Sequence, residues 1–237
     1  MRWLLTIFRI IVILIAAIPF SILAIVIGSF EQTKNVYFWS GTTWSRFVLF
    51  LCNVDVKAIG LDNINRDGNY ILVSNHASMF DIPAVMSTFP HVRIMFKKEL
   101  GYIPIWGWAL WIGHHIIVDR KKGTEAIKSL DRAAQAAKDG GQVLLFAEGT
   151  RTRDGKLQSF KRGAFTLAAK SGVPIVPLTI NGSYSILPKG SFDIRPAHIT
   201  VVIGKPIATE HITTREQEMK LMNDVRDVIT QSYVEST

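Results

Sequence analysis

A histidine and an aspartate that could form a catalytic pair follow a short apolar run. Residues 70–81 read YILVSNHASMFD, so His76 comes directly after Asn75, and Asp81 lies five residues beyond it. A histidine can act as a general base near neutral pH, and a carboxylate can fix its tautomer and stabilise the imidazolium. Five residues on a regular helix would place the two side chains on different faces. The pair therefore requires a turn, and a turn cap without a catalytic role explains the same residues.

No serine or cysteine nucleophile accompanies this pair. The sequence contains no G-x-S-x-G motif. Its one cysteine, Cys52, has no charged neighbour in the sequence to activate the thiol. We therefore expect His76, if it is a base, to activate a substrate hydroxyl. His114 and His115 lack a cysteine partner or H-E-x-x-H spacing, so we predict no metal site.

Basic residues gather after two further apolar runs. Residues 145–151 read LFAEGTR and end on Glu148, Gly149, Thr150 and Arg151. The guanidinium fork matches phosphate oxygens, and a glycine lets the backbone approach a ligand closely. Residues 118–120 read VDR, and Lys97 precedes them in a weaker basic pair. Taken alone, an exposed basic loop and a salt-bridged turn remain alternatives to an anion site.

These residues lie at the ends of predicted strands that alternate with predicted helices. Short runs rich in β-branched residues predict strands at 54–59, 70–74, 115–118, 142–147, 174–180 and 198–203. Helices are expected from Thr124 to about Gly140, over 163–171 before Gly172, and after a capping box at Thr213 and Glu216. Residues 54–237 therefore predict one α/β domain with a mixed, largely parallel sheet flanked by helices. Ligands of such sheets bind beyond the carboxyl ends of the strands.

The N-terminal segment has a different character. Residues 10–30 carry no charge, and a membrane span needs about 20 apolar residues. Residues 35–53 are again apolar and aromatic, so we predict a membrane-anchoring helical hairpin over 1–53 that crosses twice or dips into one leaflet. Arg46 and Pro19 favour the shallow form. A signal peptide fits less well because its apolar region usually has about 7–15 residues.

Composition narrows the class of partner. The 237 residues carry a net charge of +8 with 48% hydrophobic residues, which excludes a disordered chain. Four of the 27 basic and two of the 19 acidic residues precede Lys57, so the remaining chain carries a net charge of +6. No groove-reading helix or aromatic stacking platform accompanies the basic clusters. We therefore predict an anionic lipid surface, and no nucleic acid, as the partner.

Together these motifs resemble the glycerolipid acyltransferases, in particular the bacterial 1-acyl-sn-glycerol-3-phosphate (lysophosphatidic acid) acyltransferases. The family's N-H-x-x-x-x-D motif matches Asn75, His76 and Asp81. Its apolar D-R and F-x-E-G-T-R motifs match residues 117–120 and 146–151, and its K-K-x-L and V-P-I-V-P segments match residues 97–100 and 173–177. Four matches in family order, each at a strand end, are far more specific than one.

The resemblance implies a function for each motif. His76, oriented by Asp81, would take the proton of the sn-2 hydroxyl of lysophosphatidic acid, which attacks the thioester of acyl-CoA or acyl carrier protein. Arg120, Arg151 and Lys97 would hold the phosphate. Asn75, Glu148, Gly149 and Thr150 would complete the substrate site. The product would be phosphatidic acid, with no cofactor or metal, at the cytoplasmic face of the inner membrane. Another lysophospholipid or lyso-aminolipid acceptor is one alternative, and a non-enzymatic membrane tether or a nucleic-acid binder is the other.

Overall fold

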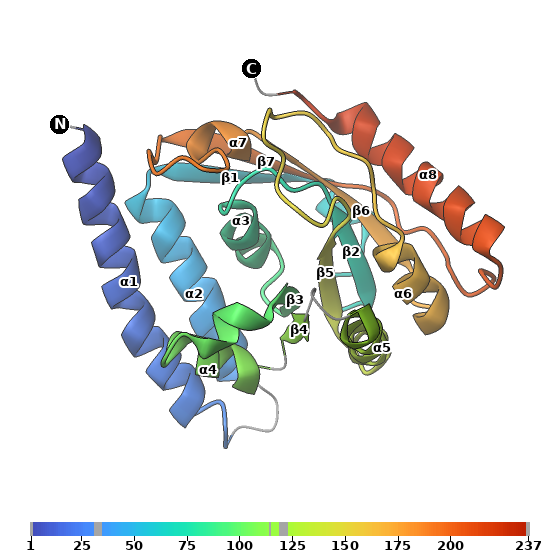
Figure 1. Cartoon of the computed structure of the whole chain (residues 1–237), viewed down its shortest axis with the longest axis horizontal. Helices are drawn as coiled ribbons and strands as arrows, with labels where there is room; N and C mark the ends of the chain where they lie inside the picture. The colour runs from blue at the N-terminus through green and yellow to red at the C-terminus, as the bar shows by residue number, and fades with distance from the viewer. Residues whose placement is uncertain (1, 31–34, 114, 119–122, 236–237) are drawn as a thin grey trace.

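A mixed sheet forms the centre of the molecule. The computed structural model describes residues 2–30, 35–113, 115–118 and 123–235. Within them, seven strands pair in the order β1-β7-β6-β2-β5-β3-β4 (Figure 1). Every neighbouring pair is parallel except β6 and β7. The strands are β1 (Val54–Ile59), β2 (Tyr70–Ser74), β3 (Val92–Lys97), β4 (Ile116–Val118), β5 (Gln142–Phe146), β6 (Ile175–Asn181) and β7 (Ala197–Ile203). The predicted fold class is confirmed.

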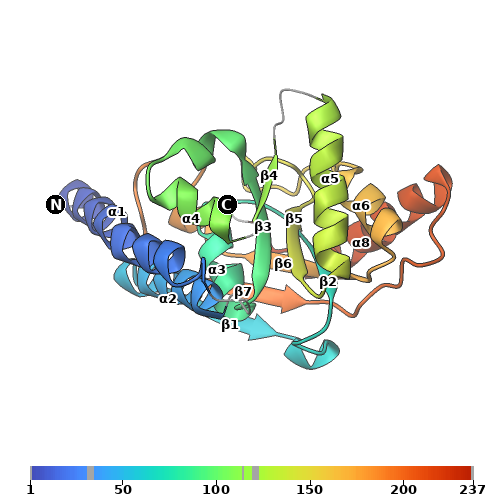
Figure 2. The same cartoon turned by 90° about the horizontal axis from the view of Figure 1, so that it is seen from below.

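Helices cover both faces of the sheet. Figure 2 shows α1 to α4 on one side of the strands and α5, α6 and α8 on the other. Alternate residues of β2 serve the two cores: Leu72 packs toward α2 and α3, while Ile71 and Val73 pack toward α5, α6 and α8. This burial on both faces explains the continuous apolar runs of the strands. The helices are α1 (Arg2–Val26), α2 (Asn35–Leu51), α3 (Asp81–Thr88), α4 (Trp106–Ile112), α5 (Gly123–Lys138), α6 (Gly163–Ser171), α7 (Ser183–Ile186) and α8 (Arg215–Ser232).

Some local predictions were wrong. The capping box of α8 is formed by Thr214 and Gln217, one residue beyond the predicted pair, because Gln217 reaches back to the backbone N–H of Thr214. Thr124 lies inside α5 and does not precede it. Strand β3 and helix α4 were not predicted. β3 alternates buried and partly exposed residues and ends on an exposed lysine, so it lacks the continuous apolar run of its neighbours.

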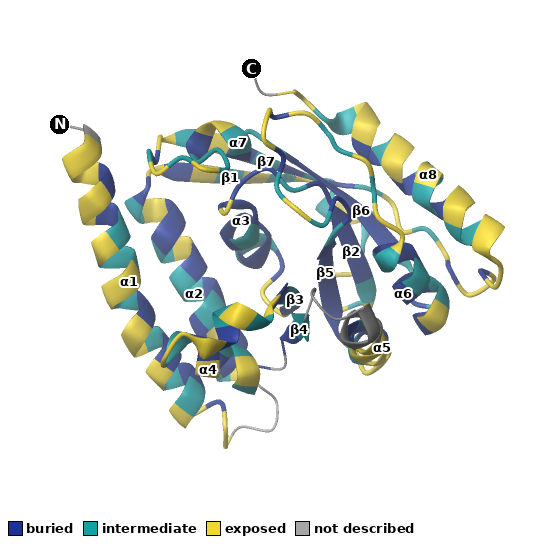
Figure 3. Cartoon of the chain, viewed as in Figure 1, coloured by how far each residue is buried: buried dark blue, intermediate teal, exposed yellow. Residues whose placement is uncertain are grey.

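Helix α1 has an inverted distribution of side chains. Its polar residues Thr6, Arg9 and Ser21 face the protein and are buried, whereas its exposed surface is formed by large apolar residues such as Phe8 and Ile15 (Figure 3). α1 packs along α2 and α4. Arg9 donates from Nε to the carbonyl of Leu51 at 3.1 Å. By length and composition, α1 can cross a membrane.

Helix α2 follows α1 and packs against α3 of the α/β body. Two helices therefore occupy the segment for which a hairpin was predicted. The division into a membrane anchor and a catalytic domain stays a prediction.

Candidate active site

The predicted pair meets at the carboxyl end of β2. His76 Nδ1 lies 2.7 Å from Asp81 Oδ2, and the backbone N–H groups of Ala77 and Ser78 donate to the same oxygen at 2.7 and 2.9 Å. Asp81 is the first residue of α3, so a tight turn returns the chain to the histidine. Its carboxylate is fully buried. The turn that the five-residue spacing requires is therefore present.

The imidazole is fixed from two sides. Its ring stacks on Phe146 of β5, with centroids 3.8 Å apart and planes 13° apart. Since a carboxylate only accepts hydrogen bonds, the contact with Asp81 places the ring proton on Nδ1. Nε2 then carries the lone pair, and the His76 side chain is 15% exposed. This arrangement suits a base that takes a proton from a bound ligand.

Glu148 joins the two loops that follow β2 and β5. Its Oε1 accepts from the backbone N–H of His76 at 2.7 Å, and its Oε2 accepts from the backbone N–H of Gln158 at 3.0 Å. Burial raises the pKa of Glu148, and these two hydrogen bonds oppose that rise. Both oxygens are engaged by the backbone, so Glu148 holds the loops in register and does not point freely into a pocket.

Asn75 makes a similar connection to β6. Its amide donates to the carbonyl of Ile180 at 2.9 Å and accepts from the N–H of Ile180 at 2.8 Å. The side chain is buried and extends the β2–β6 ladder beyond its last pair. These contacts position the strand end that carries His76, while direct contact with a substrate stays a prediction.

The loop after Glu148 is held by side chains from distant segments. Gly149 adopts a φ of +69°, which a residue with a side chain rarely adopts. Three side chains donate to alternate carbonyls of this loop. Lys189 bonds Arg151 at 3.2 Å, Tyr184 bonds Arg153 at 2.8 Å, and Tyr233 bonds Gly155 at 2.6 Å. Sequence reasoning missed these three donors. The one available signal was Pro188-Lys189-Gly190, a turn sequence soon after β6.

Thr150 and Arg151 occupy the accessible part of the same loop. Thr150 is exposed and Arg151 is partly exposed. Lys97 ends β3, is exposed, and pairs in register with Val118 of β4. Arg120 lies two residues beyond Val118 and outside the described residues. Because β2, β3, β4, β5 and β6 run in parallel, the carboxyl ends of these strands, which include Ser74, Lys97 and Phe146, lie at the same edge of the sheet.

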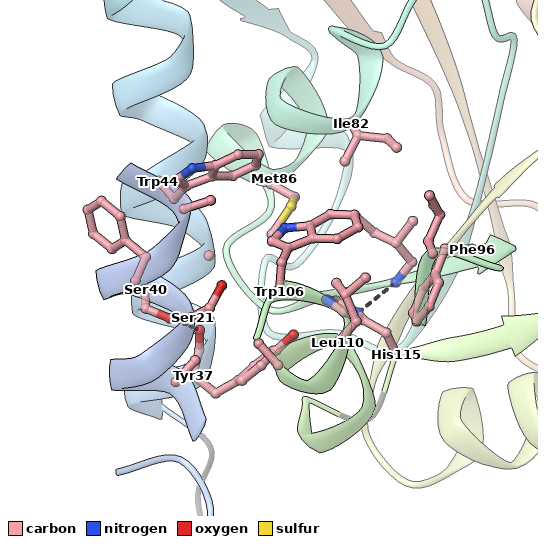
Figure 4. Close-up of a pocket in the computed structure, with 17 residues that line it drawn as sticks. Ser21, Tyr37, Ser40, Trp44, Ile82, Met86, Phe96, Trp106, Leu110 and His115 are labelled. Atoms are coloured by element: carbon pink, nitrogen blue, oxygen red, sulfur yellow. Dashed lines mark hydrogen bonds between the residues drawn. The ribbon is translucent and has the colours of Figure 1, made fainter. Parts of the chain in front are cut away.

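An apolar cavity of about 120 Å³ lies between α1, α2, α3, α4 and β3 (Figure 4). Ile82, which follows Asp81 directly, forms part of its wall together with Met86, Phe96 and Trp106. The buried indole Nε1 of Trp44, which also lines the cavity, has no hydrogen-bond partner among the described residues. The space suits a hydrocarbon chain. In the part of the chain described, no three His, Cys, Asp or Glu side chains form a metal-binding group.

The sheet, the His–Asp turn and the basic loop at its carboxyl edge define an α/β acyltransferase domain. A model of the Acyltransferase family matches residues 55–181, and the chain belongs to this family.

Known proteins with similar sequences carry the name 1-acyl-sn-glycerol-3-phosphate acyltransferase. A 1-acyl-sn-glycerol-3-phosphate acyltransferase of Limnanthes douglasii is 32% identical over 222 residues, 90% of this chain and 77% of that protein. A chloroplastic enzyme of the same name from Brassica napus is 39% identical over 150 residues, 62% of this chain. The match spans only 44% of the Brassica protein.

A solved structure shares the whole architecture. The crystal structure of the 1-acyl-sn-glycerophosphate acyltransferase PlsC from Thermotoga maritima superposes with a TM-score of 0.85 at 25% identity. The superposition covers 98% of this chain and 96% of that one. It includes the segment of α1 and α2 as well as the sheet.

Proposed function

We propose that this chain acylates the sn-2 hydroxyl of 1-acyl-sn-glycerol 3-phosphate to give phosphatidic acid. The observation that carries the proposal is the His76–Asp81 pair, at 2.7 Å, beside the loop of Arg151. The names of its relatives support the same acceptor. The acyl donor is a thioester of either CoA or acyl carrier protein. Both carriers are negatively charged, which suits binding to a basic protein.

In the reaction, His76 Nε2 accepts the proton of the acceptor hydroxyl. The hydroxyl oxygen attacks the thioester carbonyl, and the resulting imidazolium is stabilised by Asp81. Collapse of the tetrahedral intermediate expels the thiolate, and the thiolate accepts from His76 the proton that the acceptor hydroxyl gave up. The proton transfers balance, and no acyl-enzyme is formed. General-base catalysis of this kind contributes about 10²–10⁴-fold in rate.

The phosphate of the acceptor is assigned to the basic residues at the same edge. Arg151 offers a planar fork that matches two phosphate oxygens, and Lys97 and Arg120 add positive charge from the neighbouring strands. Gly149 and Thr150 form the accessible backbone beside Arg151. Asn75 and Glu148 act indirectly, because both hold the backbone that positions His76. No resident cofactor or metal takes part in this scheme.

The inverted helix α1 supports a membrane location. A helix that buries its polar residues and exposes its apolar ones is suited to lipid and not to water. We propose that α1 and α2 anchor the chain in the bilayer, with the sheet on the cytoplasmic side of the inner membrane. The acceptor would then reach the site from the leaflet, with an acyl chain in the cavity beside Ile82.

Acyl transfer from labelled acyl-CoA and acyl carrier protein to a panel of lysolipids in detergent tests the proposal. His76→Ala should lower transfer by about 10²–10⁴-fold while lipid binding is retained. His198→Ala is the matched control, since His198 is exposed and lies 3.6 Å from Asp55 at the β1–β7 edge. Retained activity in His76→Ala would refute the mechanism. Preference for a lysolipid with another headgroup would refute the acceptor.

A further inference from the structure

Lys189 lies where the Arg151 loop meets the segment that follows β6. Its Nζ donates to Thr150 Oγ1 at 2.9 Å and to the carbonyl of Arg151 at 3.2 Å. Both acceptors belong to the sequence EGTR, 38 or 39 residues earlier in the chain. The ammonium group is therefore fixed beside the residue to which the phosphate is assigned.

The same segment is also attached to the catalytic turn. The carbonyl of Leu187, two residues before Lys189, accepts from Ser78 Oγ at 3.0 Å. The backbone N–H of Ser78 in turn donates to Asp81 Oδ2. Lys189 thus has one connection to the Arg151 loop and a second, through Leu187, to the turn of His76. The ammonium is therefore held at the Arg151 loop by a segment that is itself bonded to the turn of His76.

The charge of Lys189 is not neutralised by the described part of the chain. Its two acceptors are a hydroxyl and a carbonyl, and no carboxylate there forms an ion pair with it. The guanidinium of Arg151 likewise makes no hydrogen bond to any described residue. Lys170 and Lys220, by contrast, form ion pairs with Asp131 and Asp224 at 2.6 and 3.2 Å. Two cations on one loop contact, neither of them paired with a carboxylate among the described residues, are suited to an anion. An ammonium has three N–H donors, and two of them bond Thr150 and Arg151, so one remains free to bind the anion.

We propose that Lys189 is a further phosphate-binding residue of the acceptor site. It contacts a phosphate oxygen as a point charge while Arg151 binds through its fork. The assignment rests on the proposed function, because the anion is the phosphomonoester of the lysolipid acceptor. It adds a binding residue from outside the sequence motifs, carried by the loop between α7 and β7.

Binding measured without turnover separates this proposal from the catalytic one. In the His76→Ala background, titration calorimetry in detergent gives the affinity for 1-acyl-sn-glycerol 3-phosphate and for the matching 1-monoacylglycerol, which lacks the phosphate. Adding Lys189→Met should weaken binding of the phosphate lipid about 10-fold, the value of one charged hydrogen bond. Lys189→Arg should stay within about threefold, and the monoacylglycerol should bind each variant equally.

Lys205→Met is the control, since Lys205 is exposed and lies after β7, where the chain runs toward the amino end of β6. The loss caused by Lys189→Met should also shrink at high ionic strength, because salt screens a charge interaction. Unchanged affinity for the phosphate lipid would overturn the proposal. An equal loss of affinity for both lipids would also overturn it, and would show that Lys189 only stabilises the conformation of the Arg151 loop. If the wild type transfers acyl groups, either of these two results overturns only the role of Lys189 and leaves the proposed function intact. If the wild type is inactive but shows the expected affinities, acyl transfer is refuted and the role of Lys189 in binding is not.

Discussion

A buried carboxylate follows each of the strands β2 and β5, Asp81 at the start of α3 and Glu148 in a loop, and the two are held by different hydrogen bonds. Asp81 accepts hydrogen bonds from within its own turn, from His76, Ala77 and Ser78, all through Oδ2. Glu148 accepts from residues 72 and 10 positions away, one on each oxygen. Asp81 therefore orients one imidazole within its own turn, whereas Glu148 connects two loops that are distant in the sequence.

This difference assigns a different task to each acid. Asp81 bonds the imidazole of the proposed base directly, so a change there should alter turnover more than architecture. Glu148 accepts from the backbone N–H groups of His76 and Gln158, and its loss should alter the relative placement of His76 and Arg151. Substitutions that keep the shape of each side chain test this contrast.

Asp81→Asn should have the largest effect on turnover. The amide cannot stabilise an imidazolium as a carboxylate does, and it can orient the ring with the wrong tautomer. We expect kcat to fall about 10³-fold, within the range of general-base catalysis. Steady-state kinetics with the acceptor saturating, together with a thermal melt, measure the two consequences. A variant that melts far below wild type, with normal kcat before melting, would contradict the contrast.

The control for this change is Asp154→Asn. Asp154 also accepts hydrogen bonds within a turn, from Thr152 Oγ1 at 2.9 Å and from the N–H of Lys156 at 3.2 Å. These bonds lower the pKa of its exposed carboxyl group. Since no imidazole depends on Asp154, kcat should change by less than about twofold, the scale of a surface substitution.

Glu148→Gln should affect placement and stability together. A glutamine offers one acceptor oxygen, so its NH₂ group would face the N–H of either His76 or Gln158. A buried donor without an acceptor costs about 1–3 kcal/mol. We expect the free energy of unfolding to fall by about that amount, with a rise in the KM for lysophosphatidic acid. Denaturant titration and kinetics on the same sample check this. Loss of kcat alone, with normal stability, would instead make Glu148 a chemical participant.

Gly149→Ala should lower the free energy of unfolding by less than Glu148→Gln does. Its effect should come only from the conformation of the loop after Glu148. The residue has a φ of +69°, and an added Cβ would lie 2.9 Å from Lys161 Cδ. The left-handed conformation costs a non-glycine residue about 1–2 kcal/mol, and the flexible Lys161 side chain can move away. Gly190→Ala is the matched control, because Gly190 has a φ of +90° with open space around it. If both variants lose the same stability, the backbone conformation accounts for the cost and the contact does not.

The sequence predicted the first carboxylate's contact better than the second's. The turn of His76 and Asp81 is local, so a spacing of five residues was enough to require it. The contacts of Glu148 and Lys189 depend on strand order and on where distant loops meet, and no local pattern encodes that. The continuous apolar runs of β2, β5 and β6 predicted strands because these are buried on both faces. Which face of α1 meets the protein was not predicted, because residues 10–30 carry no charge and Ser21 is one of their few polar residues.

Tyr233→Phe should have the smallest effect and tests how far the Arg151 loop depends on distant anchors. Burial, reinforced by the nearby carboxylates of Glu148 and Asp81, raises the pKa of Tyr233 to about 12. The hydroxyl therefore keeps its proton and its hydrogen bond to Gly155 throughout any assay near neutral pH. Removing that bond should cost about 0.5–1.5 kcal/mol.

The expected kinetic result of Tyr233→Phe is a two- to fivefold higher KM for lysophosphatidic acid, roughly the lower part of that free-energy range, with kcat unchanged. Tyr102→Phe removes an exposed hydroxyl and is the control. A lower kcat at constant KM would show that the anchor acts on His76 through Glu148. The two loops would then move as one unit, and the contrast between the carboxylates would apply to their contacts but not to their motion.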